Sequence, residues 1–165
     1  MLKNNQISIG WLALGMTVVA VIVLIAGRIV SESAKSKRTN REVALACTTD
    51  MATQFHIHPY LSIFVNGKAQ EIPTNIGIVN GCMNAIHTHD ASGKLHVESP
   101  EKRDFALSDF FAVWQKPFTK DRILDYQADV DHAITVTVNG AEVTTYENTV
   151  LYDGDKIIIK YEPIK

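Results

Sequence analysis

Residues 55–73, "FHIHPYLSIFVNGKAQEIP", decide the fold because they have the pattern of two strands joined by a tight turn. Asn66-Gly67 favours a two-residue hairpin turn, since both residue types tolerate positive φ. The second strand is expected over residues 69–72. Apolar residues of the first strand alternate with other side chains and are interrupted by a proline, which is typical of a half-buried strand: Ile57, Leu61, Ile63 and Val65.

The C-terminal third repeats this turn chemistry. Asn139-Gly140 follows Val136 and Val138 and predicts a second hairpin, while Asp153-Gly154 precedes an expected last strand over residues 156–161. In between, the segment 106–116, "ALSDFFAVWQK", predicts a helix that begins near Ser108 or an earlier polar residue. Its apolar residues recur at helical spacing: Leu107, Phe110, Phe111 and Trp114. These patterns predict the α+β class, as a small, mostly antiparallel β domain with one or two helices.

An apolar block precedes this domain. Residues 7–27, "ISIGWLALGMTVVAVIVLIAG", carry no charge, and at about 1.5 Å per residue a helix of this length spans the roughly 30 Å bilayer core. A cleaved signal peptide usually has a shorter apolar region and a clearer cleavage site, so a retained single transmembrane helix is the preferred prediction. We therefore expect a transmembrane anchor over 1–30, a polar stalk over 31–54 and a soluble domain over 55–165.

The charge composition of the chain limits the classes of macromolecule that it can bind. The chain of 165 residues has a formal net charge of -2, with 21% charged residues, and no basic stripe interleaves with its aromatic residues. A nucleic-acid ligand would require a basic face, so nucleic acid is not expected as a partner. Near the apolar block, however, Lys and Arg concentrate on the C-terminal side, and this bias by itself places the domain in the cytoplasm.

Histidine is concentrated in two short segments. The chain has six histidines, and residues 86–99, "IHTHDASGKLHVES", contain three of them around an Ala-Ser-Gly turn. Alternate residues of a strand share one face, so the pairs 56/58, 87/89 and 96/98 each point to one side. If the turn pairs its flanking strands, His87 or His89 lies opposite His96. The predicted metal ligands are His56, His58, His87, His89 and His96, with Asp90 and Glu98 as additional ligands or orienting carboxylates.

Two other interpretations of the cluster stay open. The imidazoles could form a hydrogen-bonded network without an ion, or they could face solvent by chance. Gathering partly buried imidazoles without an ion costs desolvation, which favours metal binding. Neutral imidazoles suit Zn and Cu, so a divalent transition metal is the expected cofactor. His132 stands alone and is expected to be an ordinary histidine.

Cys47 and Cys82 are the only cysteines, and they do not form a CxxC motif. Three states are open for them: a disulfide, two free thiols, or a thiolate ligand in the metal site. A disulfide would place the domain outside the cytoplasm and would override the Lys and Arg bias.

The motifs "HIHPYLSIFVNGKAQEIPTNIGI", "HTHDASGKLHVESPEKRDFALSDFFAVWQKPF" and "VNG…DGDKIIIKYE" together resemble a largely uncharacterised family of bacterial and archaeal membrane-anchored extracytoplasmic proteins. The resemblance covers residues 55–162, and its most specific part is the pattern HTHDxSGxxHxE. It implies an N-terminal anchor or signal and an extracytoplasmic domain, and it brings no established activity.

The expected function is therefore that of a single-pass cell-membrane protein whose extracytoplasmic domain binds copper or zinc, either by itself or as an accessory subunit of a membrane complex. Two alternatives remain open at this point. One is a metal-dependent enzyme with a histidine and carboxylate site, in which Asp90 or Glu98 acts as base. The other is an interaction module stabilised by a histidine network. The sequence has no HExxH, Ser-centred nucleophile or Gly-rich phosphate motif that would assign a reaction.

Overall fold

A computed structural model describes residues 9–36, 38–49 and 53–164, and it divides the chain into a unit up to Arg38 and a compact unit from Thr39 onward. The first unit contains helix α1 (Ile9–Ser36), whose side chains are described over residues 16–31 and are exposed there. All the predicted site residues lie in the second unit.

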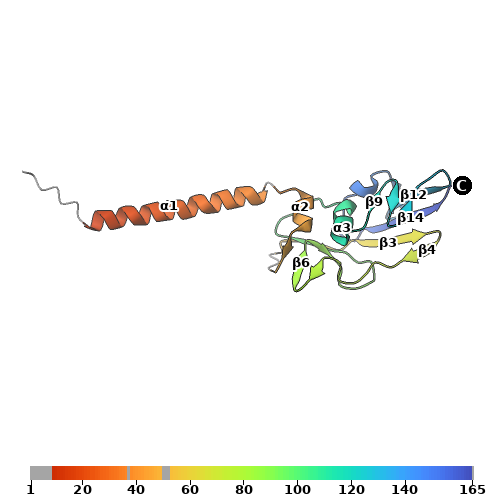
Figure 1. Ribbon diagram of the computed structural model, residues 1–165, viewed down its shortest axis with the longest axis horizontal. Helices are drawn as coiled ribbons and strands as arrows, with labels where there is room; N and C mark the ends of the chain where they lie inside the picture. The colour runs from red at the N-terminus through yellow and green to blue at the C-terminus, as the bar shows by residue number, and fades with distance from the viewer. Residues whose placement is uncertain (1–8, 37, 50–52, 165) are drawn as a thin grey trace, which may run out of the picture. The chain divides into compact units, whose positions relative to one another are not determined.

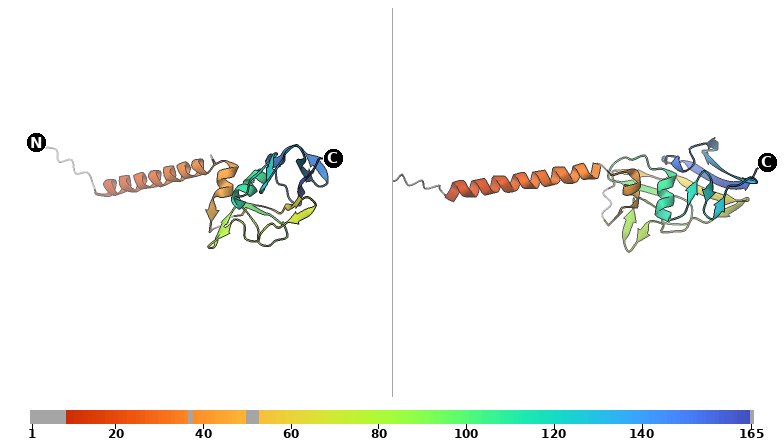
Figure 2. Two further views of the ribbon diagram at one scale, coloured as in Figure 1. Left: turned by 45° about the vertical axis from the view of Figure 1, so that its right-hand side comes forward. Right: turned by 45° about the horizontal axis from the view of Figure 1, so that its top comes forward.

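The largest sheet of the compact unit has five strands in the order β13-β12-β14-β3-β4 (Figures 1 and 2). The bounds are β3 (Tyr60–Val65), β4 (Lys68–Gln70), β12 (His132–Val138), β13 (Ala141–Val143) and β14 (Lys156–Pro163). Strands β3 and β14 pair in parallel with Lys156 opposite Tyr60, and the other pairs are antiparallel. This parallel pair joins an early strand of the predicted domain to its last strand.

Both predicted Asn-Gly hairpins are confirmed. Asn66 and Gly67 have φ of 48° and 77°, and Asn139 and Gly140 have φ of 53° and 87°. Positive φ at both central residues gives the turn a twist that matches the right-handed twist of the flanking strands. Asn and Gly occupy these positions because both residue types tolerate positive φ. The second strand of the first hairpin is β4, so it begins one residue earlier and ends two residues earlier than expected.

Three smaller sheets complete the unit, in the orders β2-β8-β7, β1-β6-β5 and β11-β10-β9. The first of these carries the histidines and consists of β2 (Phe55–Ile57), β7 (Ile86–His87) and β8 (His96–Ser99). The second consists of β1 (Cys47–Thr48), β5 (Ile78–Val79) and β6 (Cys82–Asn84), and the third of β9 (Phe118–Thr119), β10 (Arg122–Ile123) and β11 (Tyr126–Gln127).

Two α-helices and a short 3-10 helix, η1 (Tyr146–Asn148), accompany the sheets. The predicted helix is α3 (Leu107–Trp114), and it buries Leu107, Phe110 and Phe111 in the core. Its N-cap is Ala106 rather than a polar residue. The Asp109 carboxylate instead accepts a hydrogen bond from the Ala106 amide at 3.0 Å, which satisfies one of the free N–H groups at the helix start.

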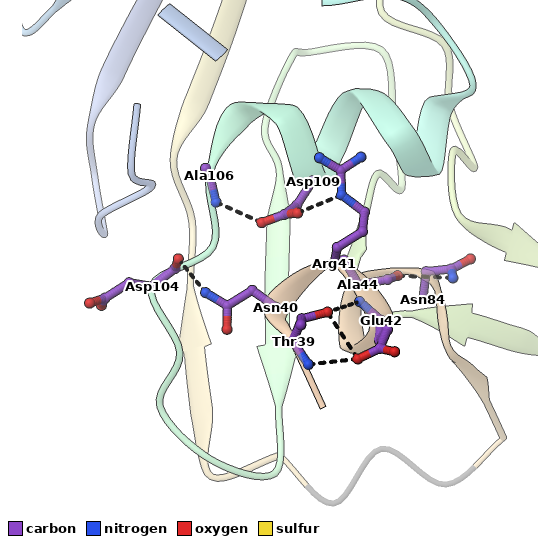
Figure 3. A network of polar contacts seen from close by, with 9 residues as sticks. All are labelled: Thr39, Asn40, Arg41, Glu42, Ala44, Asn84, Asp104, Ala106 and Asp109. Atoms are coloured by element: carbon purple, nitrogen blue, oxygen red, sulfur yellow. Dashed lines mark hydrogen bonds and ion pairs between the residues drawn. The ribbon is translucent and has the colours of Figure 1, made fainter. Parts of the chain in front are cut away.

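Helix α2 (Asn40–Leu45) is joined to α3 by polar contacts, shown in Figure 3. The Arg41 guanidinium donates to Asp109 at 2.9 Å, and the Asn40 side chain donates to the backbone carbonyl of Asp104 at 2.7 Å. Thr39 caps α2 through a reciprocal capping box with Glu42. The segment from Thr39 to Thr48, expected as part of the stalk, is therefore structured as α2 and β1.

The structure corrects the predicted fold class in two respects. The compact unit is mostly β rather than α+β, because its α-helices span only six and eight residues. In addition, no helix among the residues described is long and apolar enough to cross a membrane. The predicted span began at Ile7, outside the described residues.

Candidate metal centre

The histidines are positioned by the three-stranded sheet β2-β8-β7. Its antiparallel registers place His56 opposite Glu98 and His87 opposite His96, as the turn in residues 91–93 predicted for the second pair. Central strand β8 thus contributes one imidazole and one carboxylate on one face. His58 and His89 follow the edge strands β2 and β7.

His96 lies at the centre of the cluster. Its ring centroid is 4.6 Å from that of His58 and 5.8 Å from that of His56. On the other side it is 4.5 Å from His89 and 5.5 Å from His87. The five histidines predicted as ligands are therefore brought together around His96.

The ligand atoms form two groups and not one. Within the described part of the chain, two triads could each hold an ion: His56, His58 and His96, and His87, His89 and His96. We call these the first and second triads. In each triad, one ligand atom from each residue lies within 4.8 Å of the other two. We expected five imidazoles from neighbouring strands to meet around one cation, whereas the structure divides them between two positions that share His96.

The second triad contains a histidine with a defined tautomer. The His87 side chain is fully buried, and its Nδ1 lies 3.0 Å from the carbonyl oxygen of Asn84. A carbonyl only accepts, so Nδ1 carries the proton and donates it. The Nε2 atom of His87 consequently keeps a free lone pair, and it lies 3.2 Å from Nε2 of His89.

The surroundings favour the neutral form of three of the imidazoles, those of His58, His87 and His96. Burial of the ring is the main cause that lowers the pKa of His96 to about 4, and the neighbouring His89 and His58 lower it further. Burial also lowers the pKa of His87 and of His58 from their ordinary value. Neutral imidazole is the form that binds a metal ion, so the lowered pKa of these three rings favours metal binding by them.

The two candidate carboxylates have different positions. Glu98 Oε1 lies 3.0 Å from His56 Nε2 and 3.9 Å from His96 Nδ1, and its side chain is 15% exposed. Asp90 instead accepts a hydrogen bond from the Ser92 amide at 2.8 Å, and contacts with Ser92 are the first cause that lowers the pKa of Asp90. Glu98 therefore borders the cluster, whereas Asp90 shapes the turn between the strands and belongs to neither triad.

Cys47 and Cys82 form a disulfide with their Cα atoms 5.6 Å apart, which is one of the three states left open by the sequence and excludes the free thiols and the thiolate ligand. The bridge joins β1 to β6, and Cys47 lies opposite Asn84 in that pairing. The Asn84 side chain donates to the carbonyl of Ala44 in α2 at 3.0 Å (Figure 3), while its own carbonyl orients His87.

Sequence reasoning missed Asn84, because it acts on the ring of His87 through a backbone carbonyl that any residue type has. The sixth histidine, His132, lies outside both triads. Its ring stacks on that of Tyr161 with centroids 5.0 Å apart, and its Nδ1 lies 3.4 Å from Asp129. An ordinary histidine, and not a metal ligand, was expected there.

Comparisons with known proteins add no assignment: the chain matches no family model, no curated protein and no solved structure. The family resemblance of residues 55–162 stays a prediction.

Proposed function

We propose that this protein binds a divalent transition-metal ion, copper or zinc, through the second triad. The observation that carries the proposal is the 3.2 Å separation of Nε2 in His87 and in His89. Two nitrogens bound to a tetrahedral ion at about 2.0 Å lie roughly 3.3 Å apart, so the two imidazoles already have the spacing of ligands to one ion. His96 supplies the third ligand of this triad.

The hydrogen bond from His87 Nδ1 to Asn84 supports the same proposal. Metal-bound histidines commonly donate their second N–H to a carbonyl or carboxylate, which sets the tautomer and the ring orientation. In this chain the carbonyl is held by β6, and the neighbouring disulfide fixes that strand. His87 is thus oriented by the fold before an ion arrives, which lowers the entropic cost of binding.

Three histidines leave a fourth position of a tetrahedral ion open to water or to another ligand. An open position suits an ion that is passed on or that reacts, and it favours metal-dependent catalysis as the second candidate function. In that case Glu98 is the carboxylate closest to the imidazoles, at 3.0 Å from His56. The ligand set suits Cu(II) and Zn(II), and it offers no thiolate for a softer ion.

The location that we propose is extracytoplasmic. Disulfides persist in oxidising compartments, and the bridge between Cys47 and Cys82 therefore supports a domain outside the cytoplasm. In such a compartment the protein would meet metal ions delivered from outside the cell. We further propose that it hands its ion to a membrane complex as an accessory subunit.

A histidine network without an ion would also account for the short distance, because Nε2 of His89 could donate a proton to Nε2 of His87. Metal titration of the full chain, purified without a polyhistidine tag, separates the two. The His56→Ala/His58→Ala variant keeps only the second triad and should bind one Zn(II) or Cu(II) per chain. Adding His89→Ala should weaken this binding at least about 100-fold.

The matched control is His132→Ala, which removes a histidine outside the cluster and should leave binding unchanged. His89 is exposed, so its replacement leaves the fold intact, as near-UV circular dichroism can verify. Absence of saturable binding in the wild-type chain, or equal affinity with and without His89, would leave only the hydrogen-bonded network.

A further inference from the structure

The two triads divide four of the histidines into separate pairs that meet only through the fifth. His56 and His58 lie 4.3 Å apart by ring centroids, and His87 and His89 lie 4.8 Å apart. Among the described residues, every ring contact between one pair and the other runs through His96. A single ion near His96 can therefore take its other ligands from one pair only. The histidines of the other pair then do not coordinate that ion.

An imidazole has two nitrogens on opposite edges of its ring, and each nitrogen can bind an ion. His96 stands in the middle strand between the pairs, and its Nδ1 lies 3.9 Å from Glu98 Oε1, the same oxygen that lies 3.0 Å from His56 Nε2 in the first triad. Its ring is edge-on to the rings of both His58 and His89, at 88° and 80°. His96 is placed to serve as the common ligand of two ions.

From this arrangement we propose that the cluster is a dinuclear site, in which the first and second triads each hold one divalent ion and the imidazolate of His96 bridges them. The inference rests on the proposed function of the second triad. The first ion binds one nitrogen of neutral His96. Binding of the second ion forms a bond to the other nitrogen and displaces its proton to water, so His96 acquires a negative charge while no electron is transferred.

Negative charge near the first triad would offset part of the charge of a second cation, whereas the Lys94 ammonium acts against it. Two metal–nitrogen bonds of about 2.0 Å on opposite edges of one ring place the ions about 6 Å apart, and the imidazolate lies between them. Glu98 adds a second negative charge on the side of the first triad, 3.0 Å from His56. The Asp153 carboxylate accepts a hydrogen bond from the backbone amide of His58 at 2.8 Å.

The test is a Cu(II) titration of the full, untagged chain, followed by electron paramagnetic resonance. The wild-type chain should bind two Cu(II) ions. Because an imidazolate bridge couples their spins, the integrated signal at low temperature should be far below that of two isolated ions. The His56→Ala/His58→Ala and His89→Ala variants should each bind one ion with a full signal, and His132→Ala should match the wild type.

The outcomes separate this inference from the proposed function. Saturation of the wild-type chain at one ion would overturn the dinuclear site and would leave the second triad standing. The bridge would be overturned if the wild-type chain bound two ions with a full, uncoupled signal and His96→Ala gave the same signal. Replacement of one Cu(II) by Zn(II) should restore the full signal of one Cu(II), and a signal that stays low in the mixed protein would also overturn the proposal.

Discussion

Removal of the disulfide should destabilise the compact unit by about 4 kcal/mol. The bridge closes a loop with a sequence separation of 35 residues. In the chain-entropy description, a loop of 15 residues contributes about 3 kcal/mol and one of 100 residues about 4.7 kcal/mol, so this loop falls near 4 kcal/mol. Cys47 is exposed and Cys82 half-buried, so replacement of the two sulfurs itself costs little packing.

The measurement is urea unfolding of the metal-free Cys47→Ser/Cys82→Ser variant beside the wild type. A reductant added to the wild-type chain should reproduce the loss, and the same reductant should leave the variant unchanged. A loss below about 1 kcal/mol would refute the reasoning, because loop closure would then contribute little to the free energy of unfolding. Since β6 also carries Asn84, the carbonyl partner of His87, the variant should bind Zn(II) more weakly in the folded state.

Three further predictions concern stability. Gly93 has φ of +80°, and a Cβ there would collide with the carbonyl oxygen of Leu61, whereas Gly67 has φ of +77° and open space around it. Urea unfolding should show Gly93→Ala to be at least about 1 kcal/mol more destabilising than Gly67→Ala, and equal losses would contradict the close approach. The pKa of His96 is about 4 in the fold and about 6.5 in an unfolded chain, so the unfolded state binds more protons between these values. Stability of the metal-free protein should accordingly be full above pH 6.5 and fall as the pH drops towards 4, by at most about 1.4 kcal/mol per pH unit from this group, with a shallower dependence in His96→Ala. Asp109→Ala removes the carboxylate that joins α2 to α3 and should cost about 2 kcal/mol in thermal unfolding, while an unchanged midpoint would show that these contacts contribute nothing.

Local features of this fold could be predicted from short stretches of sequence. The two Asn-Gly hairpins, helix α3 and the last strand depend on periodicity and on turn residues within a few positions. The pairing of His87 with His96 belongs to the same class, because the turn in residues 91–93 connects their strands directly. The predicted α+β class was wrong because the α-helices described in the compact unit span only six and eight residues, whereas the strands form most of its regular structure.

By itself, then, the sequence determined the turns, the alternating strand faces and the set of five clustered histidines. Tertiary structure alone decided that β3 and β14 pair in parallel, that α2 is joined to α3, and that a backbone carbonyl of Asn84 orients His87. It also decided that the histidines form two triads around His96. The physical reason is that spacing along a strand sets the face of a side chain, whereas the distance between two ligand atoms depends on the register of strands brought together by packing of the whole core.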